Sequence, residues 1–310
     1  MSAPSPEPLP ATPERPSPAL LVLGLAAMLA LWSVNYVAGK IALRHLGPAT
    51  LISFRFQISA LLMLSIYFSQ KRRLKLRKGD LWTFAYLSVL GVAMNQGLFT
   101  LGLNYTTSAR SSIIVASDPL LILAMARLLG LESLTPGKIV GMVIAFAGII
   151  VLETEHGGSA HSAYLMGDLL SLGGALGFST YAVLTKRISR EYDPVSMNTF
   201  NCVGAAILFL PLAVRQAVHL DWKSVGWEGW SGMLYMAVCS SVFAYLIFYW
   251  LIRHMEPSRV ATVNYLQPIL VGLLASTFIG EHPTKHLVAG GLLVLGGVYL
   301  AERHAMENVS

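Results

Sequence analysis

The sequence predicts an all-α polytopic membrane protein with ten transmembrane helices, arranged as two inverted-topology repeats of five helices each. Three observations predict this fold: an apolar composition, ten apolar windows of helical length, and an internal repeat. Hydrophobic residues make up 55% of the 310 residues and charged residues only 12%. Soluble domains carry about 25% charged residues, so a soluble fold has no place for this much apolar surface.

The apolar residues gather in windows near the roughly 20 residues that a helix needs to cross the hydrocarbon core of a membrane. A membrane barrel is a poor alternative, because the run from Leu287 to Leu300 is apolar or glycine on every face instead of alternating. The ten predicted spans cover residues 19–39, 48–68, 81–103, 107–129, 137–153, 165–186, 195–215, 227–253, 257–279 and 284–302.

The chain before the first span is predicted to be a disordered cytoplasmic tail, residues 1–18. It holds seven prolines and lacks the basic segment that opens a secretory signal. The remainder divides into a first repeat, residues 19–153 with spans one to five, and a second repeat, residues 165–302 with spans six to ten. The connecting segments are too short for an additional soluble domain.

Lysine and arginine residues predict the orientation. One of the 22, Arg55, lies within the second span. With the amino terminus inside, fifteen fall on the inner side, and the bias places both termini in the cytoplasm. The basic residues follow the loops instead of forming one stripe, so the net charge of +6 does not predict a nucleic-acid partner. We expect an integral plasma membrane protein, in a bacterial inner membrane. The six residues assigned to the outer side are Lys40, Arg44, Arg110, Arg215, Lys223 and Lys285.

An internal repeat connects the two halves. The pair Asp118-Pro119 returns as Gln267-Pro268, at an offset of 149 residues that also relates Gly141 to Gly290 and Gly148 to Gly297. Nearer the start of each half the offset is 146, which relates Trp32-Ser33 to Phe178-Ser179 and Lys40 to Lys186. Because each half has five spans, an odd number, the second half enters the membrane in the opposite orientation. Such repeats favour two equivalent packings around a site near the midplane.

The chain resembles the drug/metabolite transporter superfamily, in its ten-helix EamA branch, over nearly all of residues 20 to 301. The resemblance implies export of amino acids, metabolites or amphiphilic drugs through a central cavity lined by both halves. It is carried by the segments Leu31 to Lys40, Phe178 to Lys186 and Phe54 to Phe56, by the prolines at 119 and 268, and by the segments around Glu132 and Glu281.

The function predicted from these features is secondary transport of a small molecule by alternating access, in a protein that is not an enzyme. The chain has no HExxH, GxSxG or GxxxxGK[ST] motif, so we expect no catalytic residues, no metal and no cofactor. Cys202 and Cys239 both fall within predicted spans and suggest neither a disulfide nor a zinc site. The alternatives are a membrane sensor or scaffold, and a lipid-modifying membrane enzyme.

Arg55 and Asp118 are predicted buried charges, since each lies well inside a span, where a charged side chain needs water or a partner. Arg55 either contacts an anionic group in the cavity or locks two helices together. Burial disfavours the charged form of a carboxyl group, which suits Asp118 to reversible protonation and proton coupling. The alternative is that Asp118 pairs with a basic group such as Arg55 and stays ionised.

Pro119 and Pro268 are predicted hinge residues, because proline removes a helical hydrogen bond and kinks the helix. The four glycines related by the 149-residue offset predict close helix packing, where the halves or the two protomers of a homodimer meet. Polar and aromatic residues within the spans mark the expected cavity faces. The predicted substrate-binding residues are Asn35, Tyr36, Asn95, Gln96, Asp118, Tyr181, Tyr245, Tyr249, Asn264 and Gln267.

Overall fold

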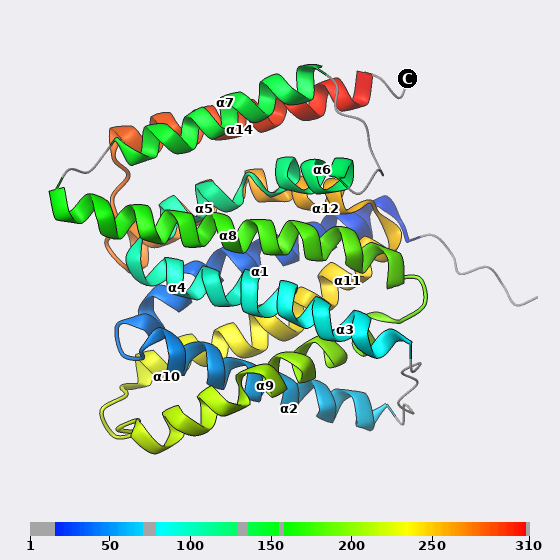
Figure 1. The fold of residues 1–310 in the computed structure, drawn as a ribbon, viewed down its shortest axis with the longest axis vertical. Helices are drawn as coiled ribbons and strands as arrows, with labels where there is room; N and C mark the ends of the chain where they lie inside the picture. Colours follow the sequence, from blue (N-terminus) through cyan, green and yellow to red (C-terminus); the bar gives the residue numbers. More distant parts are fainter. Residues whose placement is uncertain (1–15, 71–78, 129–135, 155–157, 308–310) are drawn as a thin grey trace, which may run out of the picture.

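The computed structural model describes residues 16–70, 79–128, 136–154 and 158–307, and every regular element within these ranges is a helix. Most of the predicted tail lies outside the described residues. The helices, shown in Figure 1, are α1 (Pro18–Leu43), α2 (Pro48–Ser69), α3 (Asp80–Ser88), η1 (Val89–Gly97), α4 (Leu98–Tyr105), α5 (Ser108–Val115), α6 (Asp118–Leu128), α7 (Pro136–Glu153), α8 (Gly158–Ile188), α9 (Pro194–His219), α10 (Trp227–Tyr235), η2 (Met236–Ala244), α11 (Tyr245–His254), α12 (Pro257–Ala261), η3 (Thr262–Tyr265), α13 (Gln267–Phe278) and α14 (Lys285–Glu307).

The predicted apolar windows coincide with helical segments wherever the chain is described. Seven helical stretches there are long and apolar enough to cross a membrane, and Pro136–Leu152 and Lys285–Leu300 are shorter apolar helices. The remaining window, 165–186, lies inside α8. The prediction of an all-helical protein with many apolar helices is therefore confirmed.

Capping residues fix where two of the long helices begin. The hydroxyl of Ser17 accepts a hydrogen bond from the Leu20 backbone N–H at 3.3 Å, immediately before Pro18. Asp193 caps α9 in the same way, by accepting from the N–H of Ser196 at 3.2 Å. Proline suits the first turn because its missing N–H would have no helical acceptor there.

Two predicted spans are broken instead of kinked. α5 ends at Val115 and α6 begins at Asp118, so Pro119 stands in the first turn of a new helix. Likewise, η3 ends at Tyr265 and α13 begins two residues later, with Pro268 in its first turn. The expected kink within a continuous helix is wrong at both sites, because each preceding helix has already ended and the proline opens the next one.

Two further spans contain nine-residue π-helical segments that the sequence pattern did not predict. η1 separates α3 from α4, and η2 separates α10 from α11. The wider turns of a π-helix shift the register of the side chains and are frequent at functional sites. Both segments supply residues to the cavity described below.

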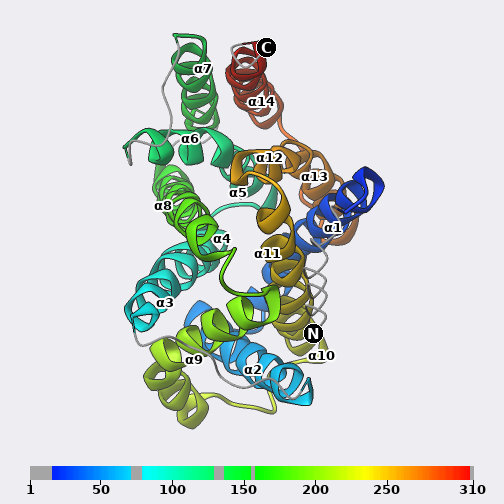
Figure 2. The ribbon, with the colours of Figure 1, turned by 90° about the vertical axis from the view of Figure 1, so that its right-hand side faces the viewer.

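Helices from the two halves interleave. Figures 1 and 2 show α7 beside α14 at one end of the molecule and α2 beside α9 at the other, and these are the two most extensive helix contacts. Between these ends, α8 packs on η1 and α4, while α1 packs on α10 and η2. In each case the first helix of one half lies against the third span of the other half.

Glycines allow the close approach of α7 and α14. A Cβ atom on Gly148 would lie 2.6 Å from the carbonyl oxygen of Gly290, and one on Gly297 would lie 2.5 Å from that of Gly141. Real Cβ atoms do not approach backbone atoms so closely, and hence these positions require glycine. The predicted glycine faces meet each other, and they join the two halves of one chain.

Two lysines at equivalent positions make equivalent contacts. Lys40 Nζ donates to the carbonyl oxygens of Leu103 and Thr106, at 2.8 and 2.6 Å. Lys186 Nζ donates to those of Ile252 and Met255, at 2.8 and 2.7 Å. Each lysine thus satisfies carbonyl groups at the end of a helix, α4 or α11, that have no helical donor. Lys40, expected on the outer side, is half-buried by this contact.

Candidate functional site

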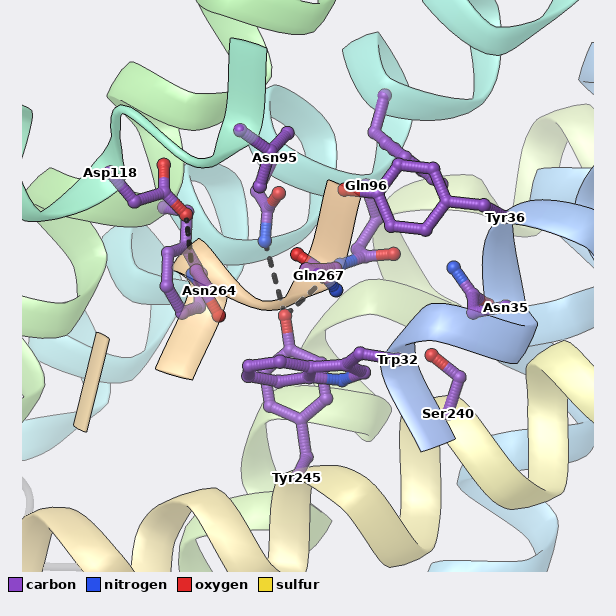
Figure 3. A pocket seen from close by; sticks show the side chains of 13 residues that line it. Trp32, Asn35, Tyr36, Asn95, Gln96, Asp118, Ser240, Tyr245, Asn264 and Gln267 are labelled. Carbon is purple, nitrogen blue, oxygen red and sulfur yellow. Dashed lines mark hydrogen bonds between the residues drawn. The ribbon is translucent and has the colours of Figure 1, made fainter. Parts of the chain in front are cut away.

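A cavity lies where segments of both halves converge, with about 440 Å³ of space not filled by atoms. Its wall comes from the middle of α1, from η1 and α4, from the two broken spans, and from α8, η2 and α11. The residues that line it, drawn in Figure 3, are Trp32, Asn35, Tyr36, Asn95, Gln96, Phe99, Val115, Asp118, Phe178, Ser240, Tyr245, Asn264 and Gln267.

Eight of the ten predicted substrate-binding residues line this cavity: Asn35, Tyr36, Asn95, Gln96, Asp118, Tyr245, Asn264 and Gln267. The other two, Tyr181 and Tyr249, are fully buried in an apolar cluster outside the lining, and their hydroxyls hydrogen-bond to each other. Helical spacing placed Tyr249 on the same face as Tyr245, but the hydroxyl of Tyr249 is already used within the protein.

Tyr245 is the centre of a polar network in the wall. Its phenol oxygen accepts a hydrogen bond from Asn95 Nδ2 and another from Gln96 Nε2, both at 3.1 Å (Figure 3). Asn95 and Gln96 are neighbours in η1, and neighbouring residues of a regular α-helix point in different directions. The π-helical segment therefore brings two adjacent amides to one acceptor.

Asp118 and Asn264 come from the two helix breaks and face each other. Asn264 Nδ2 donates to Asp118 Oδ2 at 3.3 Å, while Asp118 Oδ1 has no hydrogen-bond partner. The Asp118 side chain is at the start of α6, where the helix dipole favours a negative charge. Gln267 occupies the equivalent position at the start of α13 and also faces the cavity.

Arg55 lies behind the cavity wall. Its Nε donates to Ser241 Oγ at 2.8 Å and its Nη2 to Ser240 Oγ at 3.3 Å, while the guanidinium lies 5.5 Å from the centre of the Phe56 ring. These bonds tie α2 to η2. Arg55 and Asp118 form no ion pair, so the pairing considered from the sequence does not occur. Ser240, which lines the cavity, is the link between Arg55 and the wall.

Aromatic rings form much of the remaining wall. Trp32 packs edge-on against Phe178, with 5.7 Å between ring centres, and against Tyr245 at 5.6 Å. Tyr36 makes an edge contact with Phe99 at 4.9 Å. The predicted site omitted Trp32, Phe99, Val115, Phe178 and Ser240. The internal repeat did carry a signal for two of them, since Trp32 and Phe178 are equivalent residues of the two halves.

A buried ion pair lies outside the cavity. Arg110, assigned to the outer side from the sequence, is 1% exposed, and its Nε donates to Asp168 Oδ2 at 3.0 Å. Its Nη1 donates to the carbonyl of Leu152 at 2.6 Å, and Thr106 Oγ1 donates to Asp168 Oδ1 at 2.5 Å. Asp168 is thus a second deeply buried carboxylate besides Asp118, and it joins α8 to α5.

Apolar clusters lie on both sides of the cavity segment of α1. Met28 belongs to a buried cluster with Phe248 and Tyr249, whereas Ala42 belongs to another with Leu103. The cavity segment, from Trp32 to Tyr36, lies between these clusters. Within the described parts of the chain no group of three His, Cys, Asp or Glu side chains could hold a metal ion.

Comparison with known families identifies the family to which this chain belongs. The sequence matches the EamA-like transporter family twice, over residues 19–154 and 165–302. The chain belongs to the EamA-like transporter family. It is therefore an integral membrane protein of a family of transporters, as the residues of the resemblance indicated.

Relatives of this EamA-like protein carry transporter names. An uncharacterized transporter of Archaeoglobus fulgidus is 26% identical over 286 residues, which cover 90% of this chain and 97% of the relative. The uncharacterized transporter YvbV of Bacillus subtilis is 27% identical and covers 89% of each chain. A WAT1-related protein of Arabidopsis thaliana is 25% identical, over 90% of this chain and 80% of its own length.

A solved crystal structure has the same fold as this EamA-like protein. Its TM-score is 0.68 at 20% sequence identity, and the match covers 95% of this chain and all of the other. At this identity the likeness extends to the fold alone. It includes the helices that surround the cavity.

Proposed function

We propose that this EamA-like protein is a secondary transporter that moves small organic molecules across the membrane by alternating access. One observation carries the proposal: a cavity with polar and aromatic walls lies between two apolar clusters, at the point where broken helices from both halves meet. Opening one cluster at a time would expose the cavity to one side of the membrane and then to the other. The breaks before Pro119 and Pro268 are the proposed hinges.

The proposal includes ten membrane helices in two inverted repeats of five. The matching contacts of Lys40 and Lys186 support this arrangement, as do the helix breaks and π-helical segments at corresponding places in each half. Inverted repeats supply the two nearly equivalent packings that alternating access needs. We further propose a bacterial inner membrane location with both termini in the cytoplasm, on the distribution of lysine and arginine.

The substrate class that we propose comprises amino acids, other metabolites and amphiphilic drugs, with export as the direction. Amides beside aromatic rings suit a solute with both polar and apolar parts. Gradient coupling is proposed for Asp118, since its Oδ1 has no partner and the residue has no basic neighbour bonded to it. Homodimer formation stays a prediction.

Counterflow in proteoliposomes tests the function. Vesicles containing the full chain are preloaded with one unlabelled amino acid or amphiphilic metabolite, and uptake of the same labelled solute is followed with and without a pH gradient. We expect transient accumulation of label for at least one solute. Absence of exchange for every solute in a demonstrably folded preparation would favour the sensor or scaffold alternative.

A separate measurement tests whether Asp118 couples transport to the pH gradient. We expect the Asp118→Asn variant to lose the difference between fluxes measured with and without the pH gradient. Glu228→Gln is the matched control, because it removes a carboxylate whose side chain is half-exposed and remote from the cavity lining. If the gradient still drives net flux through Asp118→Asn, Asp118 is not the proton carrier.

A further inference from the structure

The cavity contains one ionisable carboxylate and no basic side chain. Among the lining residues Asp118 is the single acid, and none is Lys, Arg or His. The residue is 1% exposed. Its Oδ2 accepts a 3.3 Å hydrogen bond from Asn264, and its Oδ1 accepts none. An ionised Asp118 would therefore give the solute site a net negative charge.

Nearby groups do not supply a counter-ion to Asp118. The buried cation behind the cavity wall, Arg55, donates its hydrogen bonds to Ser240 and Ser241 on η2. The α6 dipole at its amino terminus stabilises a carboxylate by less than an unpaired buried charge costs. The cation must come from outside the protein, as a proton or as part of the solute.

The rest of the wall favours the solute as the source of the cation when the cavity is occupied, whereas a proton can neutralise Asp118 when the cavity is empty. Four residues of the lining have a buried amide oxygen that accepts no hydrogen bond: Asn35, Gln96, Asn264 and Gln267. A proton on Asp118 would leave them unsatisfied, and buried unpaired acceptors are costly. An ammonium group carries several N–H donors and no acceptor, so it can serve the carboxylate and the amide oxygens together.

The aromatic rings of the cavity wall also suit a cation. Trp32, Tyr36, Phe99, Phe178 and Tyr245 all line the cavity. The face of such a ring attracts a cation, most strongly for tryptophan, and it also stacks on other aromatic groups. A negatively charged or zwitterionic solute would place its carboxylate in a wall that offers no basic side chain.

We propose that the transported solute is a protonated amine with an aromatic body. Its ammonium group pairs with Oδ1 of Asp118, the carboxylate that Figure 3 shows beside Asn264, and its ring lies against Trp32 and Phe178. This inference rests on the proposed transport function and narrows its substrate class, within the metabolites and amphiphilic drugs, to amines without a carboxylate; amino acids are thereby excluded. It also assigns Asn264 a role: its amide holds the Asp118 carboxylate in place while leaving Oδ1 available.

Four probes that share a phenyl ring and a short chain test the charge preference: phenethylamine, L-phenylalanine, 3-phenylpropionate and 2-phenylethanol. Binding to the purified full chain is followed near neutral pH by tryptophan fluorescence, since Trp32 forms part of the wall. We expect phenethylamine to bind at least about tenfold more tightly than 2-phenylethanol, because only the amine pairs with the buried carboxylate. Tighter binding of the alcohol, the amino acid or the acid overturns the inference.

Variants of Asp118 test whether this residue causes the preference for the amine. In Asp118→Asn, phenethylamine should bind no better than 2-phenylethanol, while the affinity for the alcohol stays as it was. Asp118→Glu keeps the charge and should keep the preference for the amine, and the control Glu228→Gln should behave as the parent. A preference for the amine that survives Asp118→Asn contradicts the proposal.

Counterflow with the same probes separates the two proposals. Exchange of 3-phenylpropionate in preference to phenethylamine would leave the transport function in place and overturn the amine assignment. Tight binding of phenethylamine without exchange of any probe would support the amine assignment and count against transport. Exchange of phenethylamine that depends on Asp118 supports both.

Discussion

Asp118 and Asn264 stand 146 residues apart in the chain, and the amide of Asn264 donates to the Asp118 carboxylate at 3.3 Å. Each residue belongs to a broken span, one from each half. The bond therefore joins the two halves at the cavity wall. The pair is buried, and Asp118 accepts from no other side-chain donor. The strength of this hydrogen bond therefore contributes directly to the stability of the solute-free protein.

Asn264→Ala should lower the thermal stability of the solute-free protein, because it removes the one donor to a buried carboxylate. Hydrogen bonds to charged groups contribute about 1.5–3 kcal/mol. Melting in detergent, with Asp118→Asn and the double variant completing a double-mutant cycle, measures the coupling. Additive effects of the two single variants would show that the bond contributes nothing.

Arg55→Met should destabilise the protein with little effect on solute affinity, because Arg55 bonds to Ser240 and Ser241 from behind the wall. Two buried hydroxyls lose their partner, and each unsatisfied group costs about 1–3 kcal/mol. Melting temperature and solute binding are measured on the same preparation. A large loss of affinity at unchanged stability would instead assign Arg55 to the solute.

Asp168→Asn should be among the most destabilising single substitutions, since it removes the charge of a buried carboxylate that accepts from the buried Arg110 guanidinium. Breaking a buried pair in this way costs about 3–5 kcal/mol. Glu228→Gln is the matched control: it breaks the exposed contact with His45, and exposed pairs contribute about 0–1 kcal/mol. Equal melting temperatures for the two variants would contradict the structural role of Asp168.

Gly297→Ala and Gly296→Ala are adjacent substitutions in α14 with opposite expected effects. A Cβ at Gly297 would lie 2.5 Å from backbone atoms of α7, whereas one at Gly296 would meet nothing within 4 Å. We expect Gly297→Ala to reduce the melting temperature and Gly296→Ala to leave or raise it, because alanine favours a helix by about 1 kcal/mol over glycine. Similar melting temperatures for both would mean that α7 and α14 are not packed as described.

Much of the cavity could be predicted from the sequence. Polar residues are rare inside apolar spans, and a membrane-buried amide or carboxylate needs a partner or a cavity, so Asn35, Asn95 and Gln267 were identifiable without coordinates. The rule failed for Tyr181 and Tyr249, because their hydroxyl groups form a hydrogen bond with each other. It also missed Phe99 and Ser240, since nothing in the local pattern separates a cavity-lining ring or serine from one that packs against a neighbouring helix.

The sequence by itself determined the helical fold, the apolar stretches and the correspondence of the two halves, because these depend on composition, window length and spacing along the chain. Only the tertiary structure decided that Pro119 and Pro268 begin new helices, that η1 turns Asn95 and Gln96 to one acceptor, and that Arg110 is buried against Asp168. These features depend on which segments distant in the chain come within hydrogen-bond distance. Such contacts leave no periodic signal in the sequence, since each involves one residue and its partner.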